Sequence, residues 1–203
     1  MAGPQVPALA AIRFGDDDAI DAMLTRVASV LESSGRCVAG YVQVDGHRGD
    51  ACCPPIILRS LATGDDLLLS QNLGTGSRGC RLDYGALQAA AARLQAEIGP
   101  DTVLLLTNRF GKGETDGKGF RDAIGKAVDL SIPVLTAVRD TYLDGWRAFA
   151  GELGTELPFD DNAVFAWLAG HGLVTDKAQR IGASRHSAAK IDSTATASTA
   201  AIA

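Results

Sequence analysis

The stretch that decides the fold is TVLLLT, Thr102–Thr107. It is uninterrupted by charge, as expected of a strand that is covered on both faces in a parallel sheet. A second apolar run, IPVLTAV at 132–138, carries its proline near the first position, where a strand tolerates it. A loop at 108–117 and a helix near 118–130 are expected between the two runs. This order of strand, helix and strand predicts an α/β fold around a mostly parallel sheet.

The same order precedes the central strand. Residues 8–14 form a short apolar run that Gly15 closes, and apolar residues at helical spacing then continue to Gly35. Residues 37–43 have the compact, branched and aromatic character of a second strand. The next segments are predicted to be two hairpin strands of a small antiparallel extension, a glycine-rich loop and an alanine-rich helix, at 56–58, 67–70, 73–81 and 84–98.

A single domain accounts for most of the chain. With 203 residues, 46% of them hydrophobic, the chain can build one full core. We expect this domain at 1–175, with its core at 8–150 and further helices at 141–150 and 161–170, so that order ends near residue 172. Residues 182–203 are almost all Ala, Ser and Thr with scattered charges. They cannot bury enough surface to offset the entropy of ordering, and we predict a disordered tail.

Charge and hydropathy exclude several partners. A net charge of -5 and a pI near 5.1 provide no positive field for nucleic acid or an anionic membrane. No apolar run approaches the roughly 18 residues of a membrane span, and no signal peptide is readable, so a cytoplasmic location is expected. Homo-oligomerisation or a protein partner is left open.

The cysteines do not suggest a disulfide framework or a metal site. The four of them, Cys37, Cys52, Cys53 and Cys80, are few and unevenly placed, and we interpret them as free thiols. A metal site built from Cys52, Cys53 and Cys80, with or without His47, would lack the two-residue spacing of a zinc knuckle. No metal is therefore assigned to them.

The loop after the first strand is acidic where many α/β proteins bind phosphate. A phosphate loop has the pattern GxxxxGK[ST], with a lysine for the phosphates and a hydroxyl for magnesium. Here Gly15 is followed by Asp16, Asp17 and Asp18, and no lysine occurs before Lys112. The three aspartates either cap the following helix and complement its dipole, or hold a cation.

The loop after the central strand is basic and rich in glycine. Arg109 and Lys112 can bind an oxyanion as a planar fork and as a point charge, while Gly111 and Gly113 allow close approach of the backbone. Because ligands of open α/β sheets bind beyond the carboxyl ends of the strands, we interpret this loop as a candidate anion site. A solvated loop without a ligand is the alternative.

Two further groups of residues belong to the candidate site. Ser70, Arg78 and Arg81 offer a hydroxyl and two guanidinium groups near the end of a predicted strand. Arg139 directly follows the last predicted strand, where it either completes an anion pocket or forms a local salt bridge with its neighbour Asp140.

Residues 8 to about 150 resemble the bacterial family catalogued as domain of unknown function 2478. The segments that carry the resemblance are Leu61–Gly64, Ser70–Gly74, Gly79–Asp83, Asn108–Glu114 and Ile132–Val138. The family is in turn similar to small phosphate-loop nucleoside triphosphatases. The resemblance implies a three-layer sandwich of that type, with a degenerate phosphate loop.

In those triphosphatases the central strand ends in a pair of acids followed by Gly-Lys-x-Glu. Gly111, Lys112 and Glu114 match that pattern, whereas Asn108 and Arg109 replace the acids that would organise magnesium and water. Both halves of the hydrolytic apparatus are therefore absent, and Arg109 changes the preference of the pocket from cation to anion.

Three functions follow from these observations. The basic, glycine-rich loop beside an acidic phosphate-loop position favours a non-hydrolytic accessory protein that binds an oxyanion or the phosphate part of a nucleotide. Members of the family are associated with molybdate transport and molybdenum enzymes, so the resemblance implies molybdate as one such oxyanion. A divergent nucleoside triphosphatase or phosphotransferase, with Glu114 positioning water and Asp16 to Asp18 holding magnesium beside the nucleotide, is the alternative. The third function is regulation or assembly with a vestigial pocket.

Overall fold

A computed structural model of the chain describes residues 8–16, 18–45, 55–71 and 82–175. One sheet runs through the described residues, with its strands in the order β4-β3-β2-β5-β6-β1-β7. The strands are β1 (Leu9–Phe14), β2 (Val38–Asp45), β3 (Ile56–Ser60), β4 (Asp66–Leu68), β5 (Leu104–Leu106), β6 (Val134–Arg139) and β7 (Gly154–Leu157).

The sheet is mostly parallel with an antiparallel edge. Strands β2, β5, β6, β1 and β7 pair in parallel, while β3 and β4 continue the sheet antiparallel to β2. Both features confirm the arrangement expected from the apolar runs and the hairpin segments. Strand β7 was not predicted, and it adds a parallel strand beside β1.

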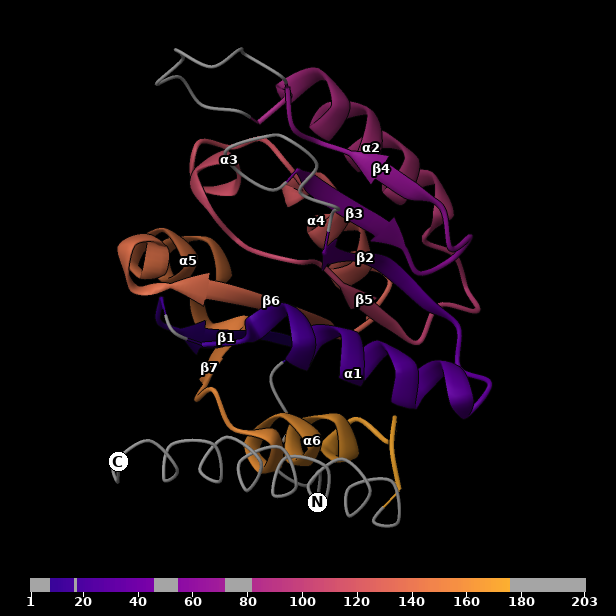
Figure 1. The fold of residues 1–203 in the computed structure, drawn as a ribbon. Coiled ribbons are helices and arrows are strands. Elements are labelled where there is room, and N and C mark those ends of the chain that lie inside the picture. Colours follow the sequence, from indigo (N-terminus) through magenta and orange to yellow (C-terminus); the bar gives the residue numbers. More distant parts are fainter. Residues whose placement is uncertain (1–7, 17, 46–54, 72–81, 176–203) are drawn as a thin grey trace, which may run out of the picture.

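Helices cover both faces of the sheet, as Figure 1 shows. On one face lie α1 (Ile20–Ser33) and α6 (Asp161–Gly170), whose Leu24 and Phe165 are fully buried in one core. On the other lie α2 (Tyr84–Glu97), α4 (Arg121–Asp129) and α5 (Leu143–Ala150), whose second core includes Leu94 and Trp146. The predicted three-layer sandwich is confirmed.

Short helical segments complete the fold. Part of the expected loop at 108–117 forms the single turn α3 (Lys112–Thr115), and two 3-10 turns, Asp140–Tyr142 and Gly151–Leu153, flank α5. Among the described residues, no helix has the length and hydropathy needed to cross a membrane. Residues 182–203 and three of the four cysteines lie outside the described residues.

The start of α1 differs from the expected aspartate cap. The helix begins at Ile20, and its N-cap is Ala19, which makes no side-chain capping bond. Asp18 instead accepts a hydrogen bond from the backbone N–H of Gly15 at 2.6 Å, and Asp16 pairs with Arg139. Capping by Asp16 and Asp18 is therefore wrong, and Asp17 lies outside the described residues.

The strand order brings three loops together at the carboxyl ends of the parallel strands, called the carboxyl edge below. Strand β1 lies between β6 and β7, and the connection through α1 to β2 crosses β6 and β5. Because all these strands are parallel, the segments after Phe14, Leu106 and Arg139 leave the sheet at the same edge. This edge is where parallel α/β sheets hold ligands.

Gly40 sets the distance between β2 and β5. Its φ is +136°, and a Cβ atom built there would lie 1.8 Å from the carbonyl oxygen of Leu106. No side chain fits without moving one strand, so Gly40→Ala is expected to lower the free energy of unfolding by at least about 3 kcal/mol. Urea unfolding followed by fluorescence of the buried Trp146 and Trp167 measures this change.

Gly125 in α4 provides the matched control. A Cβ atom there would meet nothing within 4 Å, so Gly125→Ala should raise stability by about 0.5–1 kcal/mol through its better helix propensity. Equal midpoints for Gly40→Ala and the unchanged protein would contradict the close approach of the two strands.

Candidate functional site

A pocket of about 350 Å³ opens beside the carboxyl ends of β2 and β5, between α2 and α3. Much of its wall is apolar and consists of Ile56, Leu58, Leu69, Leu82, Leu87 and Phe120. Its polar side chains are Gln43, Asn108, Arg109, Lys112 and Glu114, and Tyr84, Tyr142, Gly111 and Gly113 complete the lining. All six residues predicted from the loop after the central strand therefore line one pocket.

Asn108 faces Gln43 across the pocket wall. The backbone N–H of Gln43 donates to Asn108 Oδ1 at 3.3 Å, and Asn108 Nδ2 donates to Gln43 Oε1 at 3.4 Å. Asn108 is almost fully buried, two residues beyond the end of β5, at the position where the resemblance implied an acid in hydrolytic relatives. A pair of neutral amides thus occupies this position, as expected from the replacement of the magnesium-binding acid by Asn108.

Arg109 turns away from the pocket towards α1. Its Nη2 donates to both carboxylate oxygens of Asp21, at 2.9 and 2.8 Å, and its guanidinium lies 5.4 Å from the ring centre of Phe14. Its Nε is buried and has no hydrogen-bond partner among the described residues. The residue forms part of the pocket lining, and its charge is neutralised by the first turn of α1.

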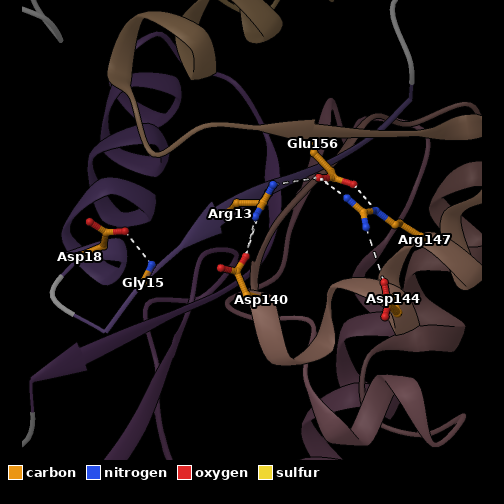
Figure 2. Close-up of polar contacts among 7 residues, drawn as sticks. All are labelled: Arg13, Gly15, Asp18, Asp140, Asp144, Arg147 and Glu156. Carbon is orange, nitrogen blue, oxygen red and sulfur yellow. Dashed lines mark hydrogen bonds and ion pairs between the residues drawn. The ribbon is translucent and has the colours of Figure 1, made fainter.

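Arg139 also lies near Phe14 and is paired with an aspartate. Its guanidinium lies 5.3 Å from the ring centre and pairs with Asp16. The neighbouring Asp140 pairs with Arg13 at 2.8 Å, as Figure 2 shows. Arg139 does not line the pocket, so the salt bridge considered for this position is present, with Asp16 in place of Asp140.

The Glu114 carboxylate shapes the loop around it. Oε1 accepts the backbone N–H of Phe120 at 2.9 Å, Oε2 accepts that of Gly111 at 3.0 Å, and the residue is buried. Gly119, with φ of +63°, passes so close that a Cβ atom would lie 2.1 Å from Oε1. The carboxylate therefore closes the turn between α3 and α4.

Lys112 is the exposed cation at the pocket. Its Nζ pairs with Asp116 one turn along α3 at 2.9 Å, with 67% of the lysine side chain exposed. The hydrogen bond to Asp116 raises the pKa of the ammonium group, and Tyr84 and Tyr142 raise it further. Lys112 stays protonated, and its exposed pair is of a kind that contributes little to stability.

The phosphate-loop position after β1 is filled by the chain itself. Figure 2 shows the Asp18 carboxylate turned back on the N–H of Gly15, at the point where a phosphate loop would begin. A carboxylate bound to a backbone N–H beside a helix start occupies the kind of position that a phosphate oxygen takes. An incoming phosphate would meet this negative charge first.

The remaining candidates are placed differently. The Ser70 hydroxyl accepts the backbone N–H of Ile56 at 3.1 Å and is not part of the pocket lining. Arg78 and Arg81 lie outside the described residues. Within the described part of the chain, no cluster of three or more His, Cys, Asp or Glu side chains could hold a metal ion, and Cys37 is an exposed free thiol.

Four residues of the site were missed in the sequence. Asp21 is the carboxylate partner of Arg109, Gln43 pairs with Asn108, and Tyr84 and Tyr142 contribute to the lining. Gln43 carried a usable signal, because it ends the predicted second strand at the ligand-binding edge. Asp21 has no such signal, since it lies in a helix whose orientation depends on the tertiary fold.

Two known proteins are similar to this chain, one in sequence and one in fold. The chain is 33% identical over 159 residues to the molybdenum import ATP-binding protein ModC 2 of Bradyrhizobium diazoefficiens, a match that covers 78% of this chain and 18% of that protein. The chain thus corresponds to less than a fifth of its curated relative. Its fold is similar to the solution structure of a human cancer-related nucleoside triphosphatase, with a TM-score of 0.53, 17% identity and coverage of 73% of this chain and 85% of the other.

The structural likeness supports the three-layer α/β fold that the sheet and its helices show. The family model described as "Protein of unknown function (DUF2478)" matches residues 9–167, and the chain belongs to that family.

Proposed function

We propose that this chain is a non-hydrolytic accessory domain that binds an oxyanion or the phosphate part of a nucleotide at the pocket beside Lys112. The observation that carries the proposal is a difference between the charged groups at the carboxyl ends of the parallel strands. Lys112 remains exposed at a pocket, while the groups that would perform hydrolysis are engaged by other parts of the chain.

Three contacts argue against hydrolysis. Asp18 occupies the Gly15 N–H at the phosphate-loop position, Arg109 is held by Asp21, and each Glu114 oxygen accepts a backbone N–H. Hydrolysis of a nucleoside triphosphate needs a phosphate cradle, a magnesium site and a residue that positions water. Among the described residues, which do not include Asp17, the corresponding groups Asp18, Arg109 and Glu114 are all engaged in these contacts.

Local charge supports an anionic ligand. The polar side chains that line the pocket include two cations, Arg109 and Lys112, and one carboxylate, Glu114, in a chain whose net charge is -5. The exposed pair between Lys112 and Asp116 is weak, so an anion can take the place of the Asp116 carboxylate. The lining itself therefore carries more cations than carboxylates, although Arg109 and Lys112 are paired with Asp21 and Asp116, which do not line the pocket.

The name of the curated relative supports a role in molybdenum metabolism. ModC 2 is a molybdenum import ATP-binding protein, and the matched segment is a small part of its length. Molybdate is a tetrahedral dianion, which proteins bind with amides, hydroxyls and cationic side chains. We therefore propose molybdate and nucleotides as the first ligands to test.

One prediction from the proposed function concerns catalysis. With ATP or GTP and magnesium, the protein should release phosphate no faster than buffer does, because its hydrolytic positions are engaged internally. A coupled phosphate assay checks this. Magnesium-dependent release that Glu114→Gln abolishes would support a divergent hydrolase instead.

Glu114→Gln also tests the structural role of the carboxylate. A carboxamide has one acceptor oxygen, so it leaves one of the two backbone N–H groups of Gly111 and Phe120 facing another donor. The free energy of unfolding should fall by about 1–3 kcal/mol. An unchanged urea midpoint would show that the two hydrogen bonds to Glu114 do not hold the turn.

Another prediction from the proposed function concerns binding. Calorimetric titration with molybdate, sulfate, ATP and GTP should give measurable affinity for at least one of them, and Lys112→Ala should weaken it about tenfold, the effect of losing one charge-assisted contact. Lys126→Ala is the matched control, because Lys126 donates to the Gln95 carbonyl oxygen and does not line the pocket. Absence of binding to all four anions would leave the vestigial pocket as the correct reading.

A further inference from the structure

The pocket is larger and more apolar than a bare oxyanion requires. Its volume of about 350 Å³ falls at the lower end of the roughly 300–1,000 Å³ typical of sites for small organic ligands. Molybdate or phosphate offers oxygen atoms alone and cannot use an apolar wall. Leu58, Leu69 and Phe120 are nevertheless almost fully buried within that wall.

The pocket also lies apart from the phosphate-loop position. Leu58, Leu69 and Phe120 belong to the core beneath α2, α4 and α5, whereas Phe14 and Ile20 belong to the core beneath α1. The two positions are therefore associated with opposite faces of the sheet. Arg109 stands between them, since it lines the pocket and bonds Asp21 in α1.

The amide pair of Gln43 and Asn108 has hydrogen-bonding capacity left. Each carboxamide has two N–H donors and an oxygen with two lone pairs, and the pair uses one donor of Asn108 and one acceptor on each side chain. Carboxamides recognise the edge of a purine ring through a donor and an acceptor together. They stand beside an aromatic and aliphatic wall on which a flat ring can stack.

Lys112 is the more exposed of the two cations in the lining. Lys112 is exposed beside Tyr84, itself 49% exposed, and its partner Asp116 is on the surface. The second cation of the lining, Arg109, already donates from Nη2 to both carboxylate oxygens of Asp21. One ammonium group matches one phosphate group, and among the described residues the lining offers no second cation as exposed as Lys112 for a longer polyphosphate.

We propose that this pocket binds a purine nucleoside monophosphate, with the base against the apolar wall and the Gln43–Asn108 amides, and the phosphate at Lys112. This inference rests on the proposed function, because it uses the same cation. It adds the class of ligand and places its ring on the face of the sheet opposite α1.

Calorimetry with five probes separates the two proposals. AMP or GMP should bind at least ten times more tightly than inorganic phosphate or molybdate, and adenosine should bind measurably without a phosphate. If phosphate or molybdate binds and neither nucleotide binds more tightly, the inference is overturned while the proposed function stands. If none of the five probes binds, the inference is overturned, and the proposed function is overturned as well when sulfate, ATP and GTP also fail to bind.

Two substitutions test the placement of the ring. Gln43→Leu keeps the size of the side chain and removes its amide, so affinity for AMP or GMP should fall about tenfold while affinity for inorganic phosphate stays unchanged. Lys112→Ala should weaken nucleotide and phosphate alike, and Lys126→Ala neither. Equal nucleotide affinity in Gln43→Leu and the unchanged protein would overturn the placement.

Leu87→Trp provides a second test that does not depend on the amides. Leu87 is a half-buried residue of α2 that lines the pocket, so a larger side chain there should exclude the base and leave Lys112 in place. The variant is expected to retain phosphate binding, which also verifies folding, and to lose nucleotide binding. Retained nucleotide binding with an unchanged thermal midpoint would contradict the inference.

Discussion

The ion pair between Asp21 and Arg109 is the contact on which the arrangement of the carboxyl edge depends. It joins residues 88 positions apart, from the first turn of α1 and the loop after β5, through two hydrogen bonds of 2.9 and 2.8 Å. Both side chains are about one third exposed, so the pair is partly desolvated. Both hydrogen bonds come from Nη2, and as charge-assisted bonds they are stronger than bonds between neutral groups.

This pair gives Phe14 its role. The ring at the end of β1 lies beside two guanidinium groups, those of Arg109 and Arg139, which are in turn neutralised by Asp21 and Asp16. Charges of both signs therefore alternate around an aromatic ring at the place where a phosphate loop would hold its ligand. The acidic segment around the start of α1 and the arginine after β5 are therefore two parts of one network of ion pairs at this position.

The fold was largely predictable because its main determinants are local. A continuous apolar run such as Leu104–Leu106 can only be a buried strand or a buried helix, and its short length between polar residues decides for the strand. Strand β7 has no such run: Gly154–Leu157 is four residues long and half-buried throughout. Its strand character comes from pairing with β1. Helix α3 is a single turn whose N-cap N–H, that of Gly111, donates to the Glu114 side chain. The glycine-rich composition of this segment predicts a loop and gives no sign of the turn.

The site was predictable only in part, for a related reason. The loop 108–114 could be chosen from its composition and its place after a strand, and all of its residues except the buried Phe110 line one pocket. The partners of Arg109 and Asn108 are 88 and 65 residues away, so their contacts depend on how strands and helices pack. The sequence therefore indicated the cations without showing which of them would be neutralised.

The ion pairs around β7 have a consequence for the behaviour of the protein at high concentration. Among the described residues β7 is the last strand on its side of the sheet, and such an edge can recruit a strand from another molecule. Figure 2 shows Glu156 of this strand between Arg13 and Arg147, with Arg147 also near Asp144. A strand that docked there would have to desolvate or separate these charges, so the edge resists aggregation even though each surface pair contributes little to folding.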